Sequence, residues 1–325
     1  MLNFIYWPIS WVLRFWHEAL GFVLPKDSGI SWILAIVLLT FTVRIFLVKP
    51  MVNQMRSMRK MQEVQPRMQE VREKYKNDQT KMAEEMRKLQ KEMGVNPLAS
   101  CIVPLVQMPI FLGLFHVLRS FNRTGNGVGQ LGMSVEETRN TPNYFFGVDE
   151  VQSFLDARIF GTPISGFISM DPQNYRAFSA DGVVDFTRTN IIVVVVPMML
   201  VASVLMHFSA RMSMDRAAKR RKASPAKGND PKAQQMQMQM DMMQKLMLWV
   251  MPVLYLLGGF AWQVGLALYM VTNMTWSYLQ QFFLYKKMDA EEEAEKEAVA
   301  ASKRTSAPKV GARPNNPKKK GKKRK

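Results

Sequence analysis

One arginine lies inside a long apolar run of the sequence, LLTFTVRIFLV, where Arg44 is the only charged residue. Thr40 precedes it by four residues, so both side chains share one face of a helix. A guanidinium in hydrocarbon costs about 2.5–3.5 kcal/mol or more unless it reaches water or a partner. Arg44 could extend to the membrane surface, because Lys49 is only ~8 Å further along a helix. The alternative is an electrostatic site, in which a fixed positive charge faces a hydrated cavity and attracts anionic groups.

Polar residues also interrupt other apolar runs. Gln107 lies between Pro104 and Pro109, and irregular, polar helices of this kind are tolerated in a membrane only where the backbone faces water or protein. Each polar residue alone is more often a helix–helix hydrogen bond than a functional group. Together with an arginine they exceed what helix packing requires, and they predict a shared hydrophilic interior. The predicted lining residues are Arg44, Thr40, Gln107, Thr272, Asn273 and Gln280.

Few residues suit chemistry beyond electrostatics. His17, His116 and His207 are far apart, and none has a carboxylate or cysteine at metal-ligand spacing. The single cysteine, Cys101, has no partner for a disulfide, and the chain has no zinc-protease, Walker A or nucleophile-elbow motif. The glycine-rich TGNGVGQ stretch follows no strand and reads as a flexible loop. We therefore expect no catalytic residue, no metal site and no cofactor.

The elements that must position these residues follow from composition. The chain has 325 residues, 48% of them hydrophobic, and a formal net charge of +18, so apolar and basic residues must be segregated along it. Each apolar run is about long enough, as a helix, to cross ~30 Å of hydrocarbon. The sequence predicts an all-α polytopic membrane protein with five transmembrane helices around a hydrophilic groove. The predicted spans are 30–48, 101–119, 190–208, 242–260 and 265–284, with an outer turn at 261–264.

The distribution of charge predicts the orientation. Residues 49–100 contain 12 Lys/Arg against 7 Asp/Glu, and residues 209–245 and 285–325 are also basic. Residues 120–189 reverse the balance, with 5 Lys/Arg, none of them lysine, against 8 Asp/Glu. The positive-inside rule places the three basic segments in the cytoplasm and the 120–189 loop outside. Five spans then put the N-terminus outside and the C-terminus in the cytoplasm. Carboxylates are missing from every predicted span, which argues against proton-coupled transport.

The N-terminal segment, residues 1–29, is rich in aromatic residues. It lacks a basic n-region and a small-residue cleavage site, so it does not resemble a signal peptide. Its tryptophans alternate with Arg14, His17 and Glu18. This mixture suits an interfacial helix along the outer surface better than a sixth span.

The segment 49–100 has two stretches of heptad spacing separated by Asn77-Asp78. Two such helices predict an antiparallel cytoplasmic coiled-coil hairpin, which Gly94 and Pro97 would end. A solvated spacer and a docking device for partner proteins both remain open, although methionine on the seam favours adaptable contacts. The expected contact residues are Met61, Met68, Tyr75, Met82 and Met86.

Two further basic segments complete the chain. Residues 209–241 are predicted as a basic cytoplasmic loop that leads into a methionine-rich helix end, and residues 285–325 as a disordered basic tail. Anionic lipids attract such a tail by ~1 kcal/mol per basic residue, and an RNA-rich partner such as the ribosome is an equal alternative. A topogenic role is the third alternative. The expected contact residues are Lys318, Lys319, Lys320, Lys322, Lys323, Arg324 and Lys325.

Several stretches resemble one known family in order and spacing. LTFTVRIFLVKP, SMRKMQEVQPRMQEVREKYKND and GVNPLASCIVPLVQMPIF are similar to the YidC-type membrane protein insertases, which are bacterial and have mitochondrial and chloroplast relatives. MPVLYLLGGFAWQVGLALYMVTNMTWSYLQQ resembles the last two spans of the family. The resemblance covers about 30–120 and 190–285. It implies a groove that is open to cytoplasm and lipid but sealed outside, in a bacterial plasma membrane.

The resemblance also implies roles for residues. Arg44 corresponds to the groove arginine of the family, and Thr40 to its neighbour one turn away. Family members receive the polar flanks of nascent membrane proteins in this groove while apolar segments move into lipid. The resemblance further implies that the hairpin contacts the signal recognition particle pathway or the general secretion translocase, and that the tail contacts ribosomes.

The chain departs from the family pattern at three places. Gln263-Val264-Gly265 replaces a usual Pro-Ala/Ser-Gly, and Met270 stands where an aromatic residue commonly follows Tyr269. No large domain precedes the first span, as in Gram-positive-type members. Two other functions remain open: a transporter or channel, which requires a pathway through the membrane, and a passive ribosome tether, which requires no groove.

Overall fold

The computed structural model describes residues 3–94, 99–124, 131–223 and 231–306. Within these ranges the chain is mostly helical, which confirms the predicted all-α class. The sheet in the described part is a single antiparallel pair of two-residue strands, β1 (Arg158–Ile159) and β2 (Thr162–Pro163). The chain divides into two compact units, Met1–Leu279 and Gln280–Lys325.

Helix α1 (Asn3–Leu20) is amphipathic and packs against α2 and α4. Its buried residues are Ile9, Ser10, Leu13 and His17. The opposite face exposes four aromatic side chains, at Phe4, Trp7, Trp11 and Phe15. A helix with this division suits an interface between protein and membrane surface.

Helix α2 (Gly29–Lys74) is one continuous helix of 46 residues, about 69 Å long. The side chain of Ser28 caps its N-terminus by accepting a hydrogen bond from the Ile30 amide at 3.2 Å. The sequence separated a span from a cytoplasmic helix at residue 48, but the helix does not break there. The drop in hydropathy after residue 48 indicates that the helix leaves its apolar surroundings. The helix itself continues, because the residues before and after this position both favour helix.

Helix α3 (Gln79–Glu92) packs back on α2, so the two form a helical hairpin. The turn between them ends at Asp78, whose carboxylate caps α3 by accepting from the Lys81 amide at 3.0 Å. Gly94 follows the helix at φ +61°, as expected for a glycine C-cap. Pro97 lies outside the described residues. Heptad pairing of the two helices as a coiled coil stays a prediction.

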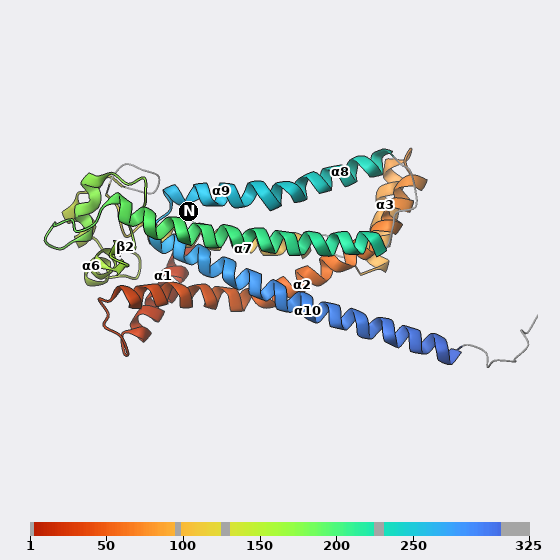
Figure 1. Ribbon diagram of the computed structural model, residues 1–325, viewed down its shortest axis with the longest axis horizontal. Helices are drawn as coiled ribbons and strands as arrows, with labels where there is room; N and C mark the ends of the chain where they lie inside the picture. Colours follow the sequence, from red (N-terminus) through yellow and green to blue (C-terminus); the bar gives the residue numbers. More distant parts are fainter. Residues whose placement is uncertain (1–2, 95–98, 125–130, 224–230, 307–325) are drawn as a thin grey trace, which may run out of the picture. The chain divides into compact units, whose positions relative to one another are not determined.

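The remaining long helices are α4, α7, α8, α9 and α10. A π-helical turn, η2 (Leu246–Val250), joins α8 to α9, and a 3₁₀ turn, η3 (Gly259–Ala261), follows α9. Helix α7 packs along η2 and α9, and the two segments run side by side in Figure 1. The helix bounds are α4 (Ala99–Arg119), α7 (Arg188–Ala223), α8 (Pro231–Lys245), α9 (Met251–Gly258) and α10 (Val264–Ser306).

Three helical stretches in the described part are long and apolar enough to cross a membrane. They are Gly29–Met61, Arg188–Lys219 and Asp241–Ala261, and a shorter apolar stretch covers Leu105–Arg119. The chain is therefore a multi-pass membrane protein. The number of five spans stays a prediction.

One segment that the sequence predicted as disordered is partly helical. The predicted basic loop 209–241 contains the end of α7 and the start of α8, where a methionine-rich helix end was predicted, with residues 224–230 outside the described part. The predicted disordered tail 285–325 is helical as far as Ser306. The prediction of disorder was wrong for residues 285–306 because Ala, Glu and Lys are strong helix formers, and Lys296 pairs with Glu292 one turn away at 2.8 Å. The predicted contact residues Lys318 to Lys325 lie outside the described residues.

The segment between α4 and α7, residues 120–187, is folded and is called here the interhelical domain. It contains α5 (Val135–Asn140), α6 (Val148–Asp156), the strand pair and a 3₁₀ helix, η1 (Pro172–Phe178). The sequence predicted a long loop, with a flexible glycine-rich stretch at 124–130. Residues 125–130 lie outside the described residues, and much of the rest packs around buried aromatic side chains.

An aromatic core joins the interhelical domain to the start of α2. Phe121 and Phe154 stack with ring centroids 4.0 Å apart, and Trp32 of α2 lies edge-on to Phe154 at 4.9 Å. The indole N–H of Trp32 donates to the hydroxyl of Ser153 on α6 at 3.0 Å. These buried rings supply the apolar surface that a loop of this length would otherwise lack.

Arginines connect the short elements of this domain. Arg139 donates to both carboxylate oxygens of Asp156, at 2.7 and 2.8 Å, and to the carbonyl of Ala177 at 3.1 Å. Arg158 donates to the carbonyls of Asp156, at 2.8 Å, and Phe178. Because a guanidinium presents several donors in a fixed plane, one side chain can satisfy several chain segments at once. This use is consistent with the presence of arginine and the absence of lysine in the segment.

Backbone contacts tie the interhelical domain to the ends of two long helices. A side chain at Gly29 would place its Cβ 1.9 Å from the Arg158 carbonyl oxygen, and one at Gly265 would place it 2.8 Å from Ile164 Cγ2. The Gly265 amide donates to the Ile164 carbonyl at 2.8 Å, and the Val264 amide donates to the Gly166 carbonyl at 2.9 Å. Both positions therefore need glycine, because a side chain there would meet the interhelical domain below contact distance.

Candidate functional site

The side chain of Arg44 is buried between α2 and α10. Only 6% of the residue is exposed. Its Nε and Nη2 atoms both donate to the side-chain oxygen of Asn273, at 2.8 and 2.5 Å, and Nη2 also donates to the Asn273 carbonyl at 3.3 Å. The structure thus brings together two of the predicted groove residues, which lie 229 positions apart.

Other polar side chains are associated with the Arg44–Asn273 pair. Tyr269 precedes Asn273 by four residues, so the two share a face of α10. Gln107 of α4 donates from its side-chain nitrogen to the Tyr269 hydroxyl at 3.3 Å. Tyr255 of α9 also lies close enough to interact electrostatically with Arg44. We call these five residues the Arg44 cluster: Arg44, Gln107, Tyr255, Tyr269 and Asn273.

The two predicted threonines use their hydroxyl groups within their own helices. Thr40 donates to the Ile36 carbonyl at 2.8 Å, and Thr272 donates to the Leu268 carbonyl at 2.9 Å. Their donors are therefore occupied, although their oxygens can still accept. Gln280 is the first residue of the second unit, so its relation to the cluster stays a prediction.

Sequence reasoning missed the two tyrosines of the cluster. The spacing of Tyr269 and Asn273 was a readable signal for one of them, whereas Tyr255 lies in an apolar stretch without such a signal. Met270, which stands in place of a common aromatic residue, is only 4% exposed and accepts a hydrogen bond from the Tyr255 hydroxyl. Its thioether is therefore part of the interior, where it packs against an aromatic ring from another helix.

His207 has a structural role rather than a place in the cluster. Its Nδ1 atom donates to the carbonyl of Leu248 at 2.9 Å. Pro252 lies four residues after Leu248 and has no N–H group to give to that carbonyl. The histidine on α7 therefore supplies the hydrogen bond that the proline cannot, at the π-helical turn η2.

The residues predicted to contact partners through the hairpin are all half-buried. The buried hydrophobic residue of this hairpin is Val64, which is 1% exposed. Half-buried side chains of this kind contribute to packing while leaving part of their surface accessible. A docking role for them stays a prediction. The residues are Met61, Met68, Tyr75, Met82 and Met86.

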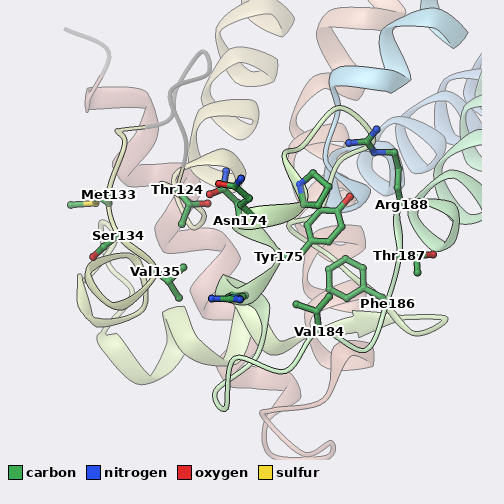
Figure 2. Close-up of a pocket in the computed structure, with 13 residues that line it drawn as sticks. Thr124, Met133, Ser134, Val135, Asn174, Tyr175, Val184, Phe186, Thr187 and Arg188 are labelled. Atoms are coloured by element: carbon green, nitrogen blue, oxygen red, sulfur yellow. The ribbon is translucent and has the colours of Figure 1, made fainter.

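A cavity of about 1100 Å³ lies in the interhelical domain and shares no residue with the Arg44 cluster. Figure 2 shows Tyr175, Phe186 and Arg188 on its wall. Arg188 donates to the Met170 carbonyl at 3.2 Å, and Tyr175 stacks obliquely on Phe186. The described residues contain no group of three or more His, Cys, Asp or Glu side chains that could hold a metal ion.

Comparison with known proteins decides between the functional classes that the geometry allows. The family described as 60Kd inner membrane protein matches residues 23–292. The chain belongs to this family. This result confirms the resemblance to YidC-type insertases that the sequence motifs indicated.

Similar relatives are actinobacterial proteins named membrane protein insertase YidC. The protein of Mycobacterium tuberculosis is 39% identical over 313 residues, which cover 96% of this chain and 80% of the relative. That of Mycobacterium leprae is 37% identical over 313 residues, covering 96% and 77%. That of Streptomyces avermitilis is 31% identical over 286 residues, covering 88% and 58%.

Proposed function

We propose that the chain is a membrane protein insertase and chaperone that acts without covalent chemistry. It receives nascent membrane proteins in a hydrophilic groove open to the cytoplasm and to lipid, and it releases their apolar segments into the bilayer. Family membership and the names of the relatives support this function. The observation that carries it is Arg44: the guanidinium is buried among polar groups, and no carboxylate pairs with it in the described part of the chain.

The physical role of such a site follows from the costs of insertion. Each central Leu, Ile or Phe of a client favours the membrane by about 0.3–0.6 kcal/mol, so an apolar segment supplies its own driving force. The barrier is the polar flank, whose groups lose water in the hydrocarbon. A groove lined by Arg44, Gln107, Tyr269 and Asn273 offers replacement hydrogen bonds and an attractive charge for acidic flanks. No nucleotide is needed for this step.

The orientation and partners belong to the same proposal. We place the N-terminus outside and the hairpin and C-terminus in the cytoplasm, as the charge distribution predicts. The partners would be nascent membrane proteins, ribosomes and anionic lipids at the basic tail, and the general secretion translocase or signal recognition particle pathway at the hairpin.

Reconstitution tests the proposal directly. The purified protein is placed in liposomes, and insertion of a short single-span client is measured by protease protection. We expect protection above empty liposomes. Arg44→Ala should lower insertion of an acidic-flank client roughly tenfold, the effect of losing one charge-assisted hydrogen bond, and leave an apolar-flank client nearly unchanged.

Arg44→Lys is the matched control, because it keeps the charge but loses the planar donor edge. It should retain part of the insertion of the acidic-flank client. Equal loss for both clients with Arg44→Ala would contradict the role of the charge. Absence of protection for every client would contradict autonomous insertion.

A further inference from the structure

One edge of the Arg44 guanidinium is occupied by an uncharged partner. Nε and Nη2 converge on the single side-chain oxygen of Asn273 at 2.8 and 2.5 Å. A carboxylate binds arginine through two parallel N–H···O bonds, and the Nε–Nη2 edge is one of the two that can form them. Asn273 therefore takes the hydrogen-bonding position of an anion without bringing a negative charge.

The charge of Arg44 remains uncompensated in this arrangement. An amide oxygen satisfies the two donors, but it does not cancel the positive charge as an aspartate at position 273 would. The residue is only 6% exposed, and weak screening strengthens the attraction of an approaching anion. The two donors of this edge therefore have a hydrogen-bond acceptor, whereas the positive charge of Arg44 is not neutralised by it.

We propose that Asn273 is a displaceable latch that sets the specificity of the groove for acidic client flanks. The aspartate or glutamate of a client replaces the Asn273 oxygen at the Nε–Nη2 edge of Arg44. A neutral flank exchanges one neutral acceptor for another and gains nothing. This inference rests on the proposed insertase function and adds to it a residue, Asn273, that competes with the client for Arg44.

The helices stay together when the latch opens. Phe41 and Trp276 lie three residues from Arg44 and Asn273 respectively, and their rings are 5.2 Å apart. This aromatic contact between α2 and α10 does not involve the guanidinium. Displacement of the amide therefore needs only a local change in side-chain conformation.

Two substitutions of Asn273 should change insertion in opposite directions. Asn273→Asp supplies a permanent carboxylate, so insertion of a client with aspartates in its flank should fall roughly tenfold, to the level of Arg44→Ala. Asn273→Ala removes the competitor, so insertion of the same client should rise roughly threefold, because the client no longer competes with the amide oxygen for the two donors of Arg44. A matched client with alanines in place of the aspartates offers no side-chain acceptor to Arg44 and should respond to neither change.

The measurement is protease protection in liposomes that contain the full-length protein. A packing role for Asn273 predicts loss with both substitutions and for both clients, and that result would overturn the latch. Unchanged insertion with Asn273→Ala would overturn it as well, even if Asn273→Asp does not fold. Failure of the wild type to insert either client would instead reject the proposed function, so the two failures are distinguishable.

Discussion

Arg44 and His207 are both polar residues inside apolar helices, but their surroundings give them different roles. His207 meets the carbonyl of Leu248, to which Pro252 has no N–H group to donate. Arg44 meets a neutral amide and keeps its charge available. The residue type alone does not separate these roles, and only the partner on the neighbouring helix does.

Replacement of His207 tests its structural role. His207→Leu leaves the Leu248 carbonyl without the side-chain donor, which should destabilise the protein by about 1–3 kcal/mol. The thermal unfolding midpoint in detergent measures this change. His207→Gln, which retains a donor, should lose less. Equal losses for the two variants would contradict the hydrogen-bond explanation.

The two close backbone contacts give a second prediction at the scale of single residues. Gly29→Ala and Gly265→Ala should each destabilise the protein by about 1–3 kcal/mol, because a new methyl group meets Arg158 or Ile164 below contact distance. Gly147→Ala is the control, since its nearest neighbour, Glu150 Oε2, is 3.7 Å away. Thermal unfolding compares the three variants, and a control as unstable as the others would refute the steric argument.

Part of the site could be predicted from the sequence at this scale. Arg44, Gln107 and Asn273 stood out because each interrupts an apolar run. In the structure Arg44 pairs with Asn273, and Gln107 pairs with Tyr269, which lies one helical turn before Asn273. Tyr255 gave no such signal, because a tyrosine in an apolar stretch looks like an ordinary core residue. Its contribution depends on packing between α9 and α10, which a linear pattern does not contain.

At the scale of elements, α1 docks through a buried histidine. His17 is 2% exposed, stacks on Trp32 with centroids 3.6 Å apart, and lies 3.0 Å from the Lys26 carbonyl oxygen through Nε2. Burial lowers the pKa of His17, whereas the Lys26 carbonyl and the carboxylates of Glu150 and Glu18 raise it less, and the Lys26 charge lowers it further. The neutral imidazole is therefore the form that fits the docked helix.

This pKa shift predicts acid sensitivity of α1. Below pH ~6.5 the undocked state binds a proton more readily than the docked state, so docking weakens as the pH falls. Hydrogen exchange in α1 should be faster at pH 5.5 than at pH 7.5. His17→Gln removes the titration, so the difference between the two pH values should shrink. A difference of equal size in the variant would assign the effect to other groups.

The interhelical domain shows why some elements could not be predicted. Helix α5 has six residues and each strand two, which is too short for a periodic pattern. Its core also depends on contacts between distant parts of the chain, such as Trp32 with Phe154. The long helices, by contrast, were predictable because hydropathy and helix propensity act locally over many residues.

At the scale of the whole molecule, the basic C-terminus gives a separate prediction. Removal of residues 307–325 deletes nine of the basic residues counted in the sequence. Ribosome co-sedimentation should fall, and its dependence on salt should become shallower, because fewer counterions are released on binding. A variant with these nine residues changed to glutamine controls for chain length. Unchanged binding in both would assign the tail to lipid or topology.

The order of segments was predictable at this scale, but their continuity was not. Sequence reasoning found the apolar runs and the two hairpin helices, and the family model matches residues 23–292, which contain them. It divided α2 into two elements and took the end of α10 as disordered. Charge and hydropathy report the surroundings of a segment, and a helix can pass from one environment into another.

The backbone contacts of the interhelical domain restrict how the long helices can move. Gly29 and Gly265 fix the first turns of α2 and α10 against the same domain. Arg44 lies about 22 Å along α2 from its fixed end, and Asn273 lies about 12 Å along α10 from its own. The interhelical domain therefore clamps the starts of both helices, and a change of side-chain conformation at Arg44 and Asn273 leaves these clamped starts in place.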